Sequence, residues 1–148
     1  MNRANFKLVK KSWATISTID YEIVCGTFYI RLFQIAPELQ HMFSNTSLTV
    51  QSVKLGCMLS YVIAKYESMD DVLQEVKALA KRHKKYGVRD EHYKAVGEAL
   101  LWTLEQGLGE YWSAGLDTAW KEFYDTLAAQ MKDASRNTMV TIQSTGKR

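Results

Sequence analysis

The chain has 148 residues, of which 47% are hydrophobic, and a formal net charge of +3 at pH 7. This length is close to the commonest domain size, so we predict one domain. One proline and eight glycines leave long stretches without a helix breaker, which indicates an all-α protein. The modest charge gives no indication of nucleic-acid binding. Since the sequence shows neither a membrane-spanning apolar run nor a signal peptide, we expect a cytoplasmic protein without membrane contact.

Apolar side chains recur at helical spacing from end to end. The predicted helices lie at about residues 4–19, 21–32, 37–43, 48–66, 68–86, 91–106 and 113–132. The face predicted to be buried on the first of them consists of Leu8, Val9, Trp13 and Ile16. Pro37 suits the first turn of the short third helix, and Gly107 and Gly109 are expected to break the sixth. Residues 134–148 are polar and are expected to fray, so the predicted domain covers residues 1–133.

One helix places a histidine on its apolar face. Four residues share that face at spacings i, i+4, i+7 and i+11: Val72, Val76, Leu79 and His83. Ser68 or Asp70 is the expected cap of this helix, and Gly87 is expected to stop it. An imidazole that faces a hydrophobic interior needs a partner, which is either a backbone carbonyl or a metal.

Two further polar residues, Tyr29 and Gln51, fall on faces predicted to be buried. Each has an ordinary explanation, because a core tyrosine often bonds a carbonyl and a glutamine near a helix start often bonds its own turn. Tyr29 and Gln51 become informative because they occur together with His83. Pro37 and Phe43 lie between Tyr29 and Gln51 in the sequence. The two cysteines, Cys25 and Cys57, sit among apolar residues and are predicted to be buried free thiols rather than a disulfide.

In this order the chain resembles the globins, and more closely the single-domain bacterial globins related to flavohaemoglobins and neuroglobin. The residues that carry the likeness are Phe28-Tyr29, Pro37, Phe43, Gln51 with Leu55, and His83 with Tyr86-Gly87-Val88. The stretch from Arg82 to Tyr93, followed by Val96-Gly97 and Leu100-Leu101, is especially similar, and the likeness covers residues 5 to 132. It implies an all-α globin fold, with six to eight helices in a 3-on-3 sandwich around haem b (iron protoporphyrin IX).

The resemblance also implies a role for each matching residue. His83 corresponds to the proximal histidine that bonds the haem iron. Its other ring nitrogen should then donate to a backbone carbonyl near Leu79. Phe43 corresponds to the phenylalanine that stacks on the porphyrin. The remaining expected haem contacts are Phe28, Leu55, Leu79, Val88 and Tyr93 inside the pocket, and Lys54, Arg82 and Tyr86 near the propionates. Lys54 and Arg82 are equally well read as solvated surface charges.

Gln51 takes the distal position that a histidine usually holds, and Tyr29 can reach the same ligand. A neutral glutamine is a poor iron ligand, so the resemblance implies an open or weakly occupied sixth site. Two hydrogen-bond donors beside bound dioxygen predict tight binding and slow release.

Three functions remain open at this point. The first is a haem protein that reversibly binds dioxygen, carbon monoxide and nitric oxide, for scavenging or sensing. The second is a nitric oxide dioxygenase that works with a separate reductase. The third is a haem-free globin-like signalling domain, so whether the chain is an enzyme stays undecided. The basic residues around His83 fit either a docking face for an acidic reductase or a solvated helix face, and we expect a monomer or a weak homodimer.

Overall fold

The structure is a computed structural model. It describes the backbone of residues 2–19 and 21–146, and the side chains of residues 2–19, 23–67 and 74–136. The elements, in chain order, are α1 (Arg3–Ile16), α2 (Tyr21–Ile35), the 3-10 helix η1 (Pro37–Phe43), α3 (Leu48–Lys65), the 3-10 helix η2 (Tyr66–Ser68), α4 (Met69–Lys85), α5 (Asp90–Leu108), the 3-10 helix η3 (Gly109–Tyr111) and α6 (Ala114–Gly146). These described residues form no strand, which confirms the all-α prediction.

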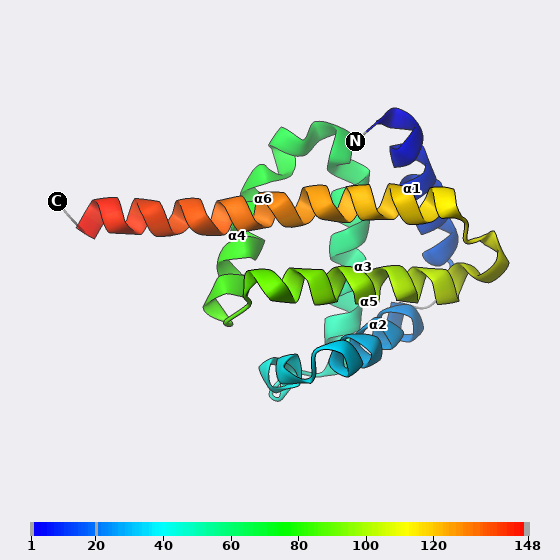
Figure 1. Cartoon of the computed structure of the whole chain (residues 1–148), viewed down its shortest axis with the longest axis horizontal. Helices are drawn as coiled ribbons and strands as arrows, with labels where there is room; N and C mark the ends of the chain where they lie inside the picture. Colours follow the sequence, from blue (N-terminus) through cyan, green and yellow to red (C-terminus); the bar gives the residue numbers. More distant parts are fainter. Residues whose placement is uncertain (1, 20, 147–148) are drawn as a thin grey trace.

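The helices cross in two layers. Helices α2, α5 and α6 contact one another in that order, and α1, α3 and α4 pack across them. Figure 1 shows α5 and α6 running roughly parallel to the long axis, while α1, α3 and α4 run across it. This is the predicted arrangement of three helices on three. Among the described residues no single helix is long and apolar enough to span a membrane. Helices η1 and α3 reach that length and apolarity only when they are taken together, and a bend of 100° separates them.

The core between the layers consists of two clusters of buried side chains. The main cluster includes Val9, Trp13 and Ile16 of α1, together with Trp120 and Phe123 of α6. The second cluster lies between α4, α5 and α6, and its buried members are Val76, Ala80, Tyr93, Ala128, Met131 and Ala134. The face of α1 predicted to be buried is therefore confirmed at Val9, Trp13 and Ile16. The predicted apolar face of α4 is confirmed at Val76 and Leu79. The exception on α1 is Leu8, which is 37% exposed because it lies at the edge of the buried stripe.

Side-chain hydrogen bonds fix α1 against both of its neighbours. The indole Nε1 of Trp120 donates to Ser12 Oγ at 2.9 Å, and the indole Nε1 of Trp13 donates to Ser60 Oγ, also at 2.9 Å. A buried indole N–H needs an acceptor, so each bond satisfies a group that would otherwise cost free energy in the core.

Two glycines end helices as left-handed residues, and a third does not. Gly87 has φ +90° at the second residue after α4, and Gly109 has φ +56° directly after α5. These values fit the preference for glycine at such positions. The prediction that Gly107 breaks α5 is wrong, because the helix continues to Leu108. A glycine inside a helix costs only about 1 kcal/mol relative to alanine, which packing readily offsets.

The last helix extends well past its predicted end near residue 132. Helix α6 continues to Gly146, and Ala134 is buried in the second cluster rather than fraying. Between Asp133 and Gly146 the sequence contains no proline or glycine, so nothing in the backbone stops the helix once periodicity is lost. The predicted caps Ser68 and Asp70, and the side chain of Val72, lie outside the described side chains.

A close approach between α5 and α6 gives a stability prediction. A Cβ added at Gly97 would lie 2.8 Å from Cε2 of Tyr124, whose hydroxyl is held by the carbonyl of Tyr93 at 2.5 Å. We expect Gly97→Ala to lower the free energy of unfolding by about 1–2 kcal/mol, since overpacking outweighs the helix-propensity gain. Gly26 on α2 has open space around it, so Gly26→Ala should instead stabilise by up to about 1 kcal/mol.

Urea denaturation of the two alanine variants beside the unchanged chain measures this difference. Equal stabilisation by both substitutions would show that Tyr124 moves aside at little cost.

Candidate functional site around His83

His83 lies on α4 with its imidazole half-buried and held in a fixed orientation. Its Nδ1 is 2.8 Å from the carbonyl oxygen of Leu79, one turn earlier, as predicted. A carbonyl only accepts, so Nδ1 carries the proton and donates. Burial lowers the pKa of His83, the Leu79 carbonyl acts in the opposite direction, and Arg82 lowers it further. The imidazole is therefore neutral at pH 7, and its Nε2 has a free lone pair.

Nothing in the described part of the chain bonds that lone pair, since Nδ1 makes the hydrogen bond recorded for the ring. The other two histidines differ from His83, one in its exposure and the other in the ring nitrogen that carries its proton. His41 is exposed on η1, and its Nδ1 contacts the carbonyl of Glu38. His92 is buried at the start of α5, and its Nδ1 accepts from the backbone N–H of Arg89 at 3.0 Å. His83 is the histidine whose geometry suits a metal.

A conventional multi-ligand metal site is absent among the described residues, which hold no group of three or more histidine, cysteine or acidic side chains. A metal at His83 would need most of its ligands from another molecule. A porphyrin supplies four nitrogens in a plane and leaves the axial positions to the protein, so a lone neutral imidazole is the donor that it requires. The residues present thus fit a haem.

Tyr29 and Gln51, from α2 and α3, are brought together. Tyr29 is 4% exposed. Burial raises the pKa of Tyr29 to about 12, and the nearby side chain of Gln51 has a smaller, lowering effect on that pKa. The hydroxyl of Tyr29 is therefore neutral and able to donate throughout the physiological range. The side chain of Gln51 lies close enough to Tyr29 on α2 to oppose the rise in its pKa.

Phe43, at the end of η1, packs edge-on against Tyr29, with ring centroids 5.3 Å apart. Phe28 adds a second edge contact to Tyr29 at 5.0 Å. Sequence reasoning missed Phe33, which lies 5.5 Å from Phe43 and 6.1 Å from Tyr29. It lies four residues after Tyr29, so the helical spacing that selected Tyr29 also contained the signal for Phe33.

The remaining predicted pocket residues divide between the two core clusters. Leu55 packs against the main cluster together with Phe43. Leu79, Val88 and Tyr93 belong to the second cluster or pack against it. Leu55 and Phe43 therefore lie with the main cluster, and Leu79, Val88 and Tyr93 lie with the second.

The short helix η1 is where these two halves meet. A Cβ on Gly87, just after α4, would lie 3.9 Å from Cε of Met42, the neighbour of Phe43. At the other end of η1, a carboxylate oxygen of Glu38 lies 4.0 Å from Nε2 of His92. These contacts place η1 beside the end of α4 and the start of α5.

The three residues expected near the propionates are exposed. Lys54 and Arg82 lie on the surface, and Tyr86 is 66% exposed. None of the three forms an ion pair with another described residue. Their exposure fits both readings of the sequence, a solvated charge and a partner for a carboxylate at the pocket rim.

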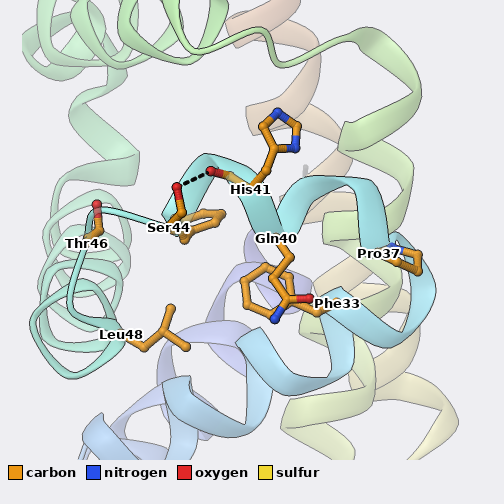
Figure 2. A pocket seen from close by; sticks show the side chains of 8 residues that line it. Phe33, Pro37, Gln40, His41, Ser44, Thr46 and Leu48 are labelled. Atoms are coloured by element: carbon orange, nitrogen blue, oxygen red, sulfur yellow. Dashed lines mark hydrogen bonds between the residues drawn. The ribbon is translucent and has the colours of Figure 1, made fainter.

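A cavity of about 610 Å³ opens at the corner between α2, η1 and α3. It is lined by Phe33, Pro37, Gln40, His41, Phe43, Ser44, Thr46 and Leu48. Figure 2 shows Gln40 beside Phe33 with Leu48 facing them, while the ring of His41 points away; Ser44 Oγ donates to the His41 carbonyl at 2.9 Å. Of the predicted haem contacts only Phe43 borders this cavity, so it is distinct from the site around His83.

The cysteines are free, as predicted, but only Cys25 is buried. Cys57 is exposed because it lies on the outer face of α3, so its predicted burial is wrong. Burial raises the pKa of Cys25 to about 11, with a smaller upward effect from Cys57 and an opposing hydrogen bond to the backbone of Gly56. Cys25 is therefore an unreactive thiol at neutral pH.

The raised pKa of Tyr29 predicts a measurable titration. An ordinary tyrosine ionises near pH 10. In the folded chain Tyr29 should stay neutral up to about pH 11, since its pKa is about 12. Its contribution to folding stability is fully present below pH 10 and is lost as the pH rises through 12. At pH 11 the absorbance near 295 nm should report equal numbers of ionised tyrosines in the folded chain and in folded Tyr29→Phe.

Denatured samples supply the control for this titration, because every tyrosine is then ordinary and the variant should show one fewer ionised group. One fewer in the folded variant as well would contradict the buried, neutral Tyr29.

Comparison with known proteins agrees with this geometry. A family model described as Globin matches residues 26–131. An anaerobic nitrite reductase of Oryza sativa subsp. indica is 32% identical over 132 residues, which cover 86% of this chain and 90% of the relative. One from Physcomitrium patens is 30% identical, and the match covers 88% of this chain and 80% of the relative. These relatives are plant proteins, so a closer likeness to bacterial globins stays a prediction.

Among solved structures, the crystal structure of a hexacoordinated haem protein from an anhydrobiotic tardigrade superposes with a TM-score of 0.80. The match covers 92% of this chain and 96% of the other at 14% identity, and it therefore speaks to the fold alone. It confirms the predicted globin fold. The match to the family model and the identity to the plant relatives show that this chain belongs to the globin family.

Proposed function

We propose that this chain is a haem protein that binds dioxygen and other diatomic ligands reversibly and with high affinity. The observation that carries the proposal is the hydrogen bond from His83 Nδ1 to the Leu79 carbonyl, which leaves Nε2 free on the inner side of α4. Because Nδ1 carries the ring proton, Nε2 keeps a lone pair that can bind a metal. Membership of the globin family supports haem as the group that does so.

Haem b would supply an iron atom that binds small ligands reversibly and exchanges single electrons. The chain would hold it with His83 as the residue that bonds the iron and with Phe43, Leu55, Val88 and Tyr93 as the surrounding walls. The Leu79 carbonyl fixes the imidazole plane, and its hydrogen bond makes the ring a stronger donor to the metal. The apolar walls exclude water, which protects ferrous iron from oxidation.

Tyr29 and Gln51 would form the distal side. Their contact with each other supports this assignment, because both side chains then point into the same space between α2 and α3. The hydroxyl and the amide each offer a donor to a ligand that carries negative charge. They would hold the ligand by hydrogen bonds and keep its release slow.

The absorption spectrum tests the proposal. We expect the purified chain to take up added haemin at one equivalent and to show the strong violet absorption band of a haem protein. Reduction and carbon monoxide should then shift that band. A chain that stays colourless after haemin is added would contradict the proposal and favour a haem-free globin-like domain that contacts protein partners.

A second candidate is nitrite reduction, which the names of the plant relatives favour. In this reaction nitrite takes up one electron and one proton and gives nitric oxide and hydroxide. The electron would come from ferrous haem, and Tyr29 or Gln51 would hold the nitrite oxygen that receives the proton. Anaerobic mixing of the ferrous chain with nitrite should then yield nitric oxide, and the yield per haem should be one unless a reductant restores the ferrous state.

A further inference from the structure

The segment that carries His83 is the most basic part of the chain. Residues 76–89 contain no acidic residue and six cations: Lys77, Lys81, Arg82, Lys84, Lys85 and Arg89. The whole chain has a net charge of only +3, so the remaining residues together are net negative. The positive charge is therefore concentrated at one place instead of being spread over the surface.

Three of these cations, Lys77, Lys81 and Lys85, follow one another at i, i+4 and i+8, and we call them the lysine stripe. All three are exposed, and none forms an ion pair within the described part of the chain. A helix dipole stabilises cations only in its last turn, which accounts for Lys85 but not for Lys77 and Lys81. Lys77 and Lys81 therefore have no ion-pair partner among the described side chains.

The lysine stripe lies on the face of α4 opposite to His83, since a rotation of 100° per residue separates them by about half a turn. A helix with its side chains is about 10–12 Å wide. A protein docked on the stripe would therefore come within about one helix diameter of the imidazole. Charge on such a surface also accelerates encounter with an oppositely charged protein.

We propose that the lysine stripe is the docking surface for an acidic one-electron carrier protein that returns ferric haem to the ferrous state. One electron leaves the reduced carrier and converts Fe(III) to Fe(II), with no atom or proton transferred. The inference rests on the proposed function, because it requires haem at His83. An extended polyanion fits the lysine stripe less well, because the rest of the chain is net negative and would repel it. A membrane also fits less well, because Gln74 and Ala78 on the same face offer no apolar anchor.

A charge-reversal triple with a matched control tests the proposal. The stripe variant is Lys77→Glu, Lys81→Glu and Lys85→Glu. The control is Arg3→Glu, Lys7→Glu and Lys11→Glu, which are exposed residues at the same i, i+4, i+8 spacing on α1. Figure 1 shows α1 at the other side of the molecule from α4. Both triples lower the net charge by the same amount.

The probe is a strongly acidic [2Fe–2S] ferredoxin. Its oxidised form is titrated calorimetrically into the apo and the haem-loaded chain at low ionic strength, and its reduced form is mixed with the ferric chain. We expect the stripe variant to lose binding in both states and to be reduced about tenfold or more slowly, within the range for electrostatic steering. The control should bind and react like the unchanged chain, whose rate should fall steeply with added salt.

Equal slowing of both triples would overturn the proposal, because net charge alone would then explain the effect. So would unchanged rates in the stripe variant, or stripe-dependent binding of anionic vesicles or DNA without ferredoxin binding. Absence of haem uptake is a separate result, visible in the spectrum before any carrier is added, and it would count against the proposed function.

Discussion

Replacing His83 by alanine is expected to remove the axial ligand and with it most of the haem affinity. The bond from Nδ1 of His83 to the Leu79 carbonyl leaves the Nε2 lone pair for the iron, and no cluster of other ligating side chains among the described residues stands in for it. We expect haem affinity to fall about a hundredfold or more, which corresponds to about 2.8 kcal/mol. Haem transfer to an apoglobin acceptor, followed by absorbance, measures this loss as a faster release.

Two further measurements separate ligation from folding. Added imidazole should enter the space left by the side chain and restore the spectrum of the unchanged protein, which a merely unfolded chain would not allow. His41→Ala is the matched control, because His41 is exposed on η1 and should leave haem release unchanged. Normal haem retention in His83→Ala would refute the assignment of His83.

The sequence was sufficient to predict the orientation of His83, because that orientation is local. Helical spacing places residue 83 on the same face as Val76 and Leu79, where the carbonyl one turn earlier is within reach of its imidazole. The fold class was predictable for a related reason, since long amphipathic segments joined by short loops leave few ways to bury their apolar faces.

Contacts between distant elements were not predictable in the same way. That Gly87 approaches Met42, or that Phe33 joins the rings of Tyr29 and Phe43, depends on how η1 packs against α2 and α4. Whether Cys57 faces inward depends on the rotation of α3 about its axis, and adjacent positions on an apolar helix differ little in sequence character. The true end of α6 was missed because helix termini depend on stop signals, and none occurs before Gly146.

The double variant Tyr29→Phe with Gln51→Leu is expected to release dioxygen far faster than the unchanged protein. Phenylalanine keeps the ring that packs on Phe43, and leucine keeps most of the volume of Gln51, so the substitutions remove the two donors and little else. A hydrogen bond to a charged group is worth about 1.5–3 kcal/mol. At about 1.4 kcal/mol per factor of ten, each donor should slow release about 10- to 100-fold.

Stopped-flow displacement of dioxygen by carbon monoxide gives the dissociation rate for the double variant and for each single variant. We expect the effects of the two single variants to differ from an independent sum, because Tyr29 and Gln51 are close enough to interact. A control with Gln106→Leu near the end of α5 and Tyr111→Phe in η3, both exposed, should leave the rate unchanged. An unchanged rate in the distal double variant would mean that these two side chains face each other without facing the ligand, and the tight-binding function would fall while haem binding through His83 would stand.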